Sequence, residues 1–308
     1  MRLTVPSRRG FLAGAAATLF APRLWATERP VILILTSDET ERTLTIASRF
    51  KKACDFAVRM SYLVGNESDA GAFIADNIRG QPVACVFAVG AAATRVAIRE
   101  FAASPVIFAE VPPDGAPTSG PNLYPITTRL DPTPTLERLL KLLPGMKEVG
   151  LLCKSSTETY WPAAAEAAKA LGLRATVRQV QEPDEVPNAF MALTGPTELV
   201  WLQQEPRIWT GGALSRVFHE ATIQRFPLVG FARAHLDSPN PPPVVACGHP
   251  EGIGDLASRL ARSIVLGEAA PTELGVAPML IGHARAMRAA GFVVSAKSTE
   301  VLDELVGR

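Results

Sequence analysis

The residues that most often catalyse reactions or bind metals are few in this chain and lie far apart. The four histidines are scattered, and the four cysteines include no Cys-X-X-Cys pair. Cys247 and His249 could supply two metal ligands, but no third ligand stands beside them, whereas zinc sites use three or four protein ligands. Asp131 and Glu205 could form an acid–base pair only if the fold brought them together. Nucleophile-elbow, HExxH, P-loop and dinucleotide-binding motifs are also missing from the sequence. We therefore expect no enzyme, no metal site and no cofactor.

Polar and small residues follow the ends of the expected strands, and they are the best candidates for ligand binding. In an open α/β sheet, ligands bind beyond the carboxyl ends of the strands, where helix N-termini present free N–H groups. Such residues suit hydrogen bonding to a small polar ligand held between two lobes. Any one of them could instead cap a helix or lie in a solvated loop. The candidate ligand-binding residues are Thr36, Ser37, Gly90, Ala91, Glu110, Lys154, Ser155, Gln203, Gln204, Glu205 and Arg233.

The elements that must position these residues alternate between strand and helix, and the alternation occurs twice. Short, continuous apolar runs are typical of strands buried on both faces of a parallel sheet. The first series of expected strands covers 31–35, 57–64, 83–89 and 105–109. After a crossover rich in proline and glycine, the second series covers 149–153, 175–180, 199–202 and 227–231. With helical patterns between the strands, the sequence predicts the α/β class, with two doubly wound parallel-sheet lobes joined by hinge crossovers.

The C-terminal part of the chain can complete both lobes. An amphipathic helix is expected over 251–266, between strands at 244–247 and 278–281. We expect the first lobe to comprise 27–128 plus 246–270, and the second to comprise 129–245 plus 271–308. The chain would then cross between the lobes more than once, which makes a hinge.

The first 26 residues have the pattern of an export signal peptide. Arg8 and Arg9 precede an apolar run over 11–22, which is too short to span a bilayer, where about 20 residues are needed. A small residue at Ala26 offers a cleavage site. The arginine pair resembles a twin-arginine signal, which exports folded proteins. A frayed amphipathic N-terminus is the alternative. We expect an exported protein of the periplasm that is soluble once the signal is removed.

The charge balance argues against nucleic acid as a partner. The chain has 31 Lys and Arg against 30 Asp and Glu, without the basic surplus that nucleic-acid binding needs. The expected signal holds four arginines and no acid, so the rest has 27 basic against 30 acidic residues, a net charge of −3. Because the periplasm permits disulfides, Cys54 and Cys85 could pair or remain separate thiols.

Several stretches together resemble the ABC-transporter substrate-binding proteins that include binders of the tryptophan/tyrosine type. The similarity extends over most of residues 80–291. The stretches that carry it are 86–93, 105–109, 136–152, 168–173 and 266–271. The turns expected to line a pocket depart from the family pattern, with Gly90-Ala91 where the family has Gly-Thr, and Lys154-Ser155 where it has an Asn-Pro-like turn. The resemblance therefore implies the type I periplasmic binding fold and a binding role, without the family's ligand.

The resemblance and the export signal together lead to a functional hypothesis. We expect a periplasmic solute-binding protein of an ABC-type importer, monomeric, that binds a small polar or amino-acid-like ligand in the interlobe cleft. The membrane permease of the transporter would be its partner. One alternative is a ligand-sensing accessory module of the same fold that signals to a membrane receptor. A more remote alternative is an exported enzyme that uses Asp131, Glu205 or His249.

Overall fold

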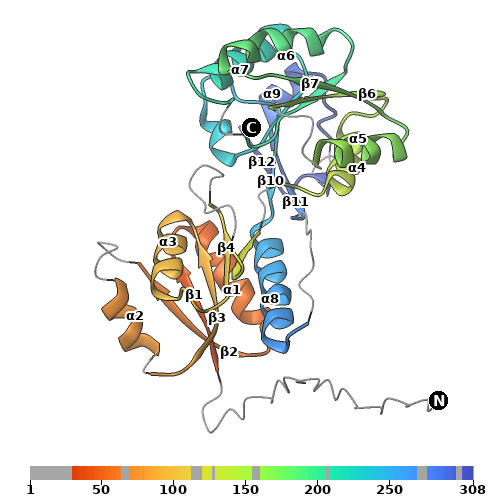
Figure 1. Ribbon diagram of the computed structural model, residues 1–308. Coiled ribbons are helices and arrows are strands. Elements are labelled where there is room, and N and C mark those ends of the chain that lie inside the picture. The colour runs from red at the N-terminus through yellow and green to blue at the C-terminus, as the bar shows by residue number, and fades with distance from the viewer. Residues whose placement is uncertain are drawn as a thin grey trace, which may run out of the picture.

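A computed structural model of the chain shows two α/β lobes stacked one above the other (Figure 1). It describes residues 30–63, 70–78, 80–111, 120–126, 129–154, 160–205, 208–268, 276–295 and 300–307. The expected export signal, 1–26, lies outside these residues. In the described part of the chain, no helix has both the length and the apolar character needed to span a bilayer.

The first lobe is built on a five-stranded parallel sheet with the strand order β2-β1-β3-β4-β5. Its strands are β1 (Val31–Thr36), β2 (Ala57–Tyr62), β3 (Val83–Val89), β4 (Val106–Ala109) and β5 (Leu123–Pro125). Its helices are α1 (Glu41–Ala53), α2 (Ala70–Ile78), α3 (Ala91–Glu100) and α8 (Pro250–Leu266). Because β1, β3 and β4 are buried on both faces, they read as continuous apolar runs in the sequence.

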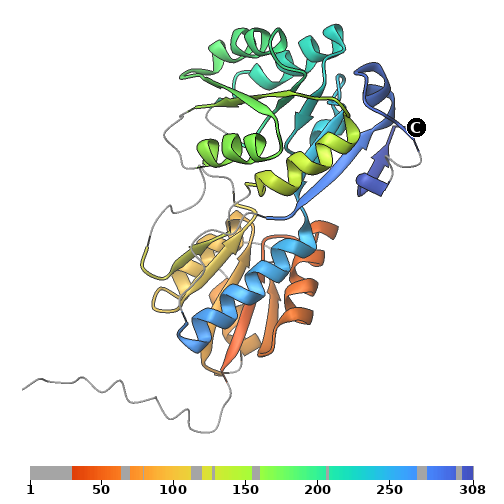
Figure 2. The same cartoon turned by 90° about the vertical axis from the view of Figure 1, so that its right-hand side faces the viewer.

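Helix α8 belongs to the first lobe although it comes late in the chain. It lies along the lobe beside α1, as Figure 2 shows. Gly254 allows this close approach, because a Cβ atom there would lie 2.7 Å from the carbonyl oxygen of Ile46 in α1. Arg49 of α1 and Asp255 of α8 form an ion pair across the contact, with 2.7 Å between Nε and Oδ1.

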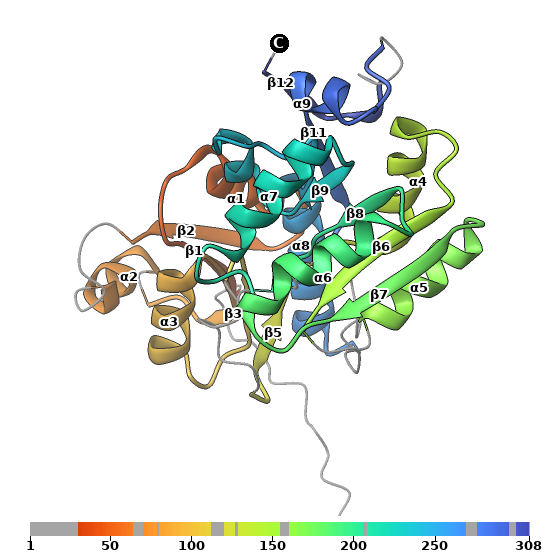
Figure 3. The same cartoon turned by 90° about the horizontal axis from the view of Figure 1, so that it is seen from above.

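The second lobe is built on a seven-stranded sheet with the order β12-β11-β10-β9-β8-β6-β7. Its strands are β6 (Glu148–Cys153), β7 (Arg174–Gln179), β8 (Leu199–Trp201), β9 (Leu228–Gly230), β10 (Val244–Gly248), β11 (Pro278–His283) and β12 (Glu304–Val306). The α-helices are α4 (Pro132–Leu142), α5 (Tyr160–Ala170), α6 (Val186–Thr194), α7 (Ala213–Gln224) and α9 (Ala284–Ala289), with 3-10 turns η2 (Pro183–Glu185) and η3 (Arg233–Asp237). Seen from above, α6 and α7 lie on one side of strands β6–β8 and α5 lies on the other (Figure 3).

The structure confirms the two-lobed α/β architecture and changes two details of it. Strand β11 is antiparallel to β10, so the second sheet is mixed rather than wholly parallel. Residues 246–248, which we expected in the first lobe, belong to β10 and pair with β11 in the second sheet. The other expected lobe boundaries stay predictions. None of the four cysteines, all of which lie in the described ranges, forms a disulfide, so Cys54 and Cys85 are not bonded to each other.

Three segments that pass between the lobes are joined by backbone hydrogen bonds. The N–H of Val276 donates to the carbonyl of Arg129 at 3.3 Å, and the N–H of Asp131 donates to the carbonyl of Val276 at 3.2 Å. The N–H of His249 donates to the carbonyl of Ala277 at 2.9 Å. The residues before α4, before α8 and before β11 therefore form one narrow, hydrogen-bonded connection.

Candidate functional site

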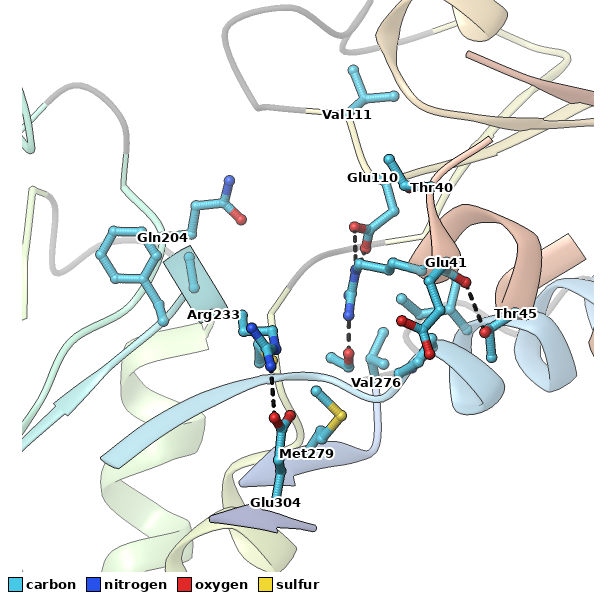
Figure 4. A pocket seen from close by; sticks show the side chains of 17 residues that line it. Thr40, Glu41, Thr45, Glu110, Val111, Gln204, Arg233, Val276, Met279 and Glu304 are labelled. Carbon is cyan, nitrogen blue, oxygen red and sulfur yellow. Dashed lines mark hydrogen bonds and ion pairs between the residues drawn. The ribbon is translucent and has the colours of Figure 1, made fainter. Parts of the chain in front are cut away.

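A pocket of about 850 Å³ lies between the two lobes (Figure 4). The first lobe contributes the start of α1, the turn after β4 and the first turn of α8. The second lobe contributes the segments that follow β8 and β9, the end of β10, the start of β11, and β12. The pocket thus lies where carboxyl ends of strands from both sheets meet, the usual place for ligands in open α/β folds. It is lined by Thr40, Glu41, Arg42, Thr45, Glu110, Val111, Gln204, Phe231, Ala232, Arg233, Cys247, Gly248, Pro250, Ile253, Val276, Met279 and Glu304.

Arg42 and Glu110 form a two-point ion pair on the first-lobe side. Arg42 Nε donates to Glu110 Oε2 at 2.7 Å, and Nη2 donates to Oε1 at 3.0 Å. Nη2 also donates to the carbonyl oxygen of Gly248 at 2.9 Å, at the end of β10. Burial alone would lower the pKa of Arg42, but the hydrogen bond and the charge of Glu110 outweigh it, so the pKa is raised. Arg42 therefore stays charged and connects the turn after β4 to the interlobe connection.

Glu110 holds an unusual backbone conformation. Its φ angle is +57°, in the left-handed region that favours glycine. A non-glycine residue there costs about 1–2 kcal/mol. Such residues cluster at ligand-binding sites, where the surrounding structure holds them in place. The conformation marks the turn after β4 as a candidate functional position.

The second-lobe side carries another ion pair. Arg233 Nη2 lies 2.6 Å from Glu304 Oε1, and Figure 4 shows both side chains on the opposite side of the pocket from Glu110. The hydrogen bond to Glu304 raises the pKa of Arg233, so Arg233 also stays charged. Gln204 and the ring of Phe231 lie near it, and Phe231 packs on Trp209 with 5.9 Å between ring centroids. Each lobe thus contributes one ion pair to the pocket, and Glu41 adds a further carboxylate on the first-lobe side.

Two sulfur-containing side chains also line the pocket. Cys247 and Met279 are cross-strand partners in β10 and β11, and both line the pocket. Burial raises the pKa of the Cys247 thiol to about 11. The thiol is therefore protonated at neutral pH and is a poor nucleophile.

Three of the candidate ligand-binding residues come together in this pocket, namely Glu110, Gln204 and Arg233. Ser155 lies outside the described residues. The remaining candidates lie away from the pocket lining: Thr36, Ser37, Gly90, Ala91, Lys154, Gln203 and Glu205.

Several of these remaining candidates have local structural roles. Ser37 Oγ accepts a hydrogen bond from the N–H of Ala93 at 2.9 Å, so it caps the start of α3. Gly90 has a φ of +91°, and a Cβ there would lie 2.5 Å from Ser37 Oγ. Thr36 is fully buried, and its hydroxyl has no hydrogen-bond partner among the described residues.

Glu205 is a buried structural acceptor. The residue is 6% exposed, and its carboxylate accepts hydrogen bonds from the N–H of Lys154 at 2.7 Å and from Trp161 Nε1 at 3.0 Å. The neighbouring Gln203 is also buried, and its carbonyl accepts from Trp209 Nε1 at 2.7 Å. These contacts hold the turns after β6 and β8 together.

The sequence analysis missed most of the charged groups of the pocket. Arg42 and Glu41 lie in the first turn of α1, and Glu304 lies in β12. The signal for Arg42 was present, because a helix that follows a strand's carboxyl end begins at the ligand-binding edge of the sheet. No comparable signal marks Glu304, since a three-residue strand near the C-terminus has no periodic pattern.

The residues weighed for catalysis or metal binding have other placements. Asp131 accepts from the N–H of Thr133 at 3.0 Å and caps α4. His249 is the residue before α8. Across the ranges that the structure describes, no three His, Cys, Asp or Glu side chains are grouped to hold a metal ion.

Comparison with known proteins links the chain to solved structures only. No protein-family model matches it, and no curated protein sequence does. A ligand-free, open substrate-binding protein with adhesive properties from Clostridium difficile is 16% identical, with a TM-score of 0.55, covering 91% of this chain and all 100% of that one. An ABC domain in complex with L-Trp from Streptococcus pneumonia is 14% identical, with a TM-score of 0.51 and coverage of 90% and 100%. A chain of the XylFII–LytSN complex is 8% identical, with a TM-score of 0.55 and coverage of 84% and 99%.

At these identities the likeness establishes the fold. The chain has the two-lobed α/β fold of type I periplasmic substrate-binding proteins. Its ligand and partners are not carried over from these neighbours, since unrelated functions share folds.

Proposed function

We propose that this protein is a periplasmic solute-binding protein of an ABC-type importer, and that it binds a small polar or amino-acid-like ligand between its lobes. The observation that carries the proposal is the interlobe pocket, to which each lobe contributes an ion pair. Its volume of about 850 Å³ falls within the range of small-molecule sites. The two neighbours named as substrate-binding or L-Trp-bound proteins support a binding role.

The charges of the pocket favour a ligand that carries both signs. Arg42 and Arg233 are each paired with a glutamate, and Glu41 adds a carboxylate that pairs with no other side chain among the described residues. A ligand carboxylate would bind a guanidinium, and a ligand ammonium would bind a glutamate, with charge-assisted hydrogen bonds. Glu110, Gln204 and Arg233 therefore stay in the proposed ligand set, and Arg42 and Glu304 join it. The other strand-end candidates stay predictions.

Ligand binding would bring the lobes together. A ligand that contacts both lobes binds the closed arrangement more tightly, and this difference in affinity shifts the population toward it. The narrow interlobe connection is the place where backbone angles would change. Arg42 lies at this place, since it bonds both Glu110 and the Gly248 carbonyl.

The remaining parts of the proposal follow from this role. Residues 1–26 would direct export to the periplasm, a membrane permease would receive the loaded monomer, and no nucleic acid or cofactor would take part. We also propose that the protein is not an enzyme. The protonated Cys247 thiol and the structural hydrogen bonds of Glu205 and Asp131 support this.

A sensing role is the second candidate. A structural neighbour of the same fold is a chain of the XylFII–LytSN complex, so it is solved bound to another protein. This chain could likewise report ligand occupancy to a membrane receptor. Neighbouring genes separate the two roles, since permease and ATPase genes favour transport and a kinase gene favours sensing.

Thermal unfolding of the full chain tests the binding proposal. We expect at least one member of a panel of amino acids and small organic acids to raise the melting temperature, because a ligand that binds only the folded state stabilises it. Arg42→Gln should abolish the ligand-induced rise. The matched control is Arg49→Gln, which breaks the ion pair of Arg49 with Asp255 outside the pocket. The side chains of this pair are 35% and 30% exposed, close to the 34% and 26% of Arg42 and Glu110.

The control should keep the ligand-induced rise although its starting melting temperature falls. The proposal fails if no ligand of the panel raises the melting temperature of the wild type. It also fails if Arg42→Gln and Arg49→Gln respond equally to the ligand.

A further inference from the structure

A second cavity, of about 500 Å³, lies in the second lobe at the other end of its sheet. Phe226 and Pro243 line it, and they come just before β9 and β10. Those strands run away from the cavity. Cys247 near the end of β10 and Ala232 after β9 line the interlobe pocket. His283, at the end of the antiparallel β11, also lines the cavity. The two pockets therefore lie at opposite ends of the same strands, and a ligand in one does not touch the other.

Two arginines line this outer cavity without a balancing acid. Arg225 follows α7 and Arg285 lies in α9, and the helices border the cavity from two sides. Neither guanidinium has a hydrogen bond or ion pair within the described ranges, and no Asp or Glu lines the cavity. The outer cavity is therefore positively charged.

The backbone conformation at Arg225 favours glycine, which indicates that the arginine side chain has a role of its own. Arg225 ends α7 in the left-handed conformation, with φ of +53°. Helix α8 ends in the same conformation at Gly267, with φ of +70°, which is the residue expected there. Glycine adopts this conformation without the roughly 1–2 kcal/mol that a side chain costs. Apart from Glu110 in the interlobe pocket, Arg225 is the only non-glycine with positive φ among the described residues.

Much of the remaining lining is apolar and rigid, although Thr222, Ser238 and His283 also line the cavity. Phe218, Phe226 and Leu236 form apolar walls, and a proline-rich segment over 239–243 borders them. Proline fixes φ, so this wall is pre-organised. Ser238 Oγ is buried and has no hydrogen-bond partner in the described part of the chain.

We propose that the outer cavity binds a small organic anion with an apolar body, such as an aromatic or branched-chain monocarboxylate. The carboxylate would accept hydrogen bonds from Arg225 and Arg285, and the apolar part would pack between Phe218, Phe226 and the prolines. The site does not depend on the interlobe ligand, so it holds whether or not the transport proposal does.

Calorimetric titration of the full chain with phenylacetate and isovalerate tests the site. At least one of these carboxylates should bind, and phenylacetamide, which lacks the charge, should bind at least tenfold more weakly than phenylacetate. Arg225→Gly and Arg285→Gln should each weaken carboxylate binding at least tenfold. Arg225→Gly should not lower the melting temperature, because glycine suits the backbone there. The matched control is Arg288→Gln, an exposed arginine of the same helix as Arg285 that does not line the cavity, and it should bind as the wild type does.

Three results would overturn the proposal. The first is that neither phenylacetate nor isovalerate binds. The second is equal binding of phenylacetate and phenylacetamide. The third is carboxylate binding that Arg42→Gln removes and Arg225→Gly leaves intact, since this would assign the carboxylate to the interlobe pocket.

Discussion

At the scale of single residues, Arg42 and Glu110 show what a sequence can and cannot predict about this site. Glu110 directly follows an apolar strand run, and that position predicted it as a ligand-binding candidate. Arg42 lies 68 residues away on a helix, where an arginine is ordinarily a solvated surface residue. Only the fold brings its guanidinium to Glu110 and to the Gly248 carbonyl. Strand-end position therefore identifies part of a pocket, and tertiary contacts supply the rest.

The burial of His235 should make the stability of the protein depend on pH. Its ring lies between Phe218 and Phe231, with centroid distances of 5.1 and 4.4 Å, and burial lowers its pKa from 6.5 to about 4. Below pH 6.5 the unfolded chain takes up a proton that the folded protein refuses until about pH 4. The free energy of unfolding should therefore fall by up to about 1.4 kcal/mol per pH unit across this window.

Urea denaturation at pH 7 and pH 5 measures this effect. His235→Phe keeps an aromatic ring in place without a titrating group, so it should lose less stability than the wild type between these two pH values. Replacement of the exposed His219 by Gln should retain the wild-type loss. An equal loss in the wild type and in His235→Phe would contradict the assignment to His235.

Glu205 should act on stability rather than on any reaction. In Glu205→Gln, the side-chain amide keeps only one acceptor oxygen. Its NH2 group would therefore face one of the two N–H donors, that of Lys154 or that of Trp161. We expect a loss of about 1–3 kcal/mol in the free energy of unfolding, because a buried donor is left unpaired.

The matched control is Glu198→Gln. Glu198 accepts from the backbone N–H groups of Lys147 and Glu148 at an exposed position, where water can replace the lost bonds. Denaturant unfolding of both variants compares them, and equal losses would show that burial is not the cause.

At the scale of elements, the sequence predicted the buried strands well and the short edge strands poorly. The apolar runs of β1, β3, β4 and β6 stand out because both faces of each strand are covered. Strands β5 and β12, of three residues each, have no pattern to detect. The direction of β11 was also not predictable, since an apolar run does not reveal whether its neighbour is parallel.

Two glycines of α8 give a direct test of how it packs on α1. In Gly254→Ala, the new Cβ would lie 2.7 Å from the Ile46 oxygen and 2.9 Å from the Phe50 nitrogen, so the helices must separate. We expect a loss of about 1–3 kcal/mol in the free energy of unfolding. In Gly252→Ala the nearest atom is 3.4 Å away, and the gain in helix propensity, at most about 1 kcal/mol, should dominate. Denaturation followed by circular dichroism distinguishes them, and similar effects of the two variants would contradict this packing.

At the scale of the whole molecule, two lobes and one narrow connection make a hinge the natural motion. Alternating strand and helix patterns predicted both lobes. The hydrogen bonds that join the connecting segments around Arg129, His249 and Val276 could not be predicted, because they link residues far apart in the sequence. Because α8 returns to the first lobe, its first turn lines the interlobe pocket next to the connection between the lobes. A ligand bound there can favour the closed arrangement of the two lobes.

Small-angle X-ray scattering, with and without a ligand that raises the melting temperature, tests the central claim most directly. Ligand binding between the lobes should lower the radius of gyration of the wild type, since closure brings the lobes together. Arg49→Gln should show the same decrease, whereas Arg42→Gln, at the same ligand concentration, should show none. An unchanged radius of gyration of the wild type at saturating ligand would contradict the account.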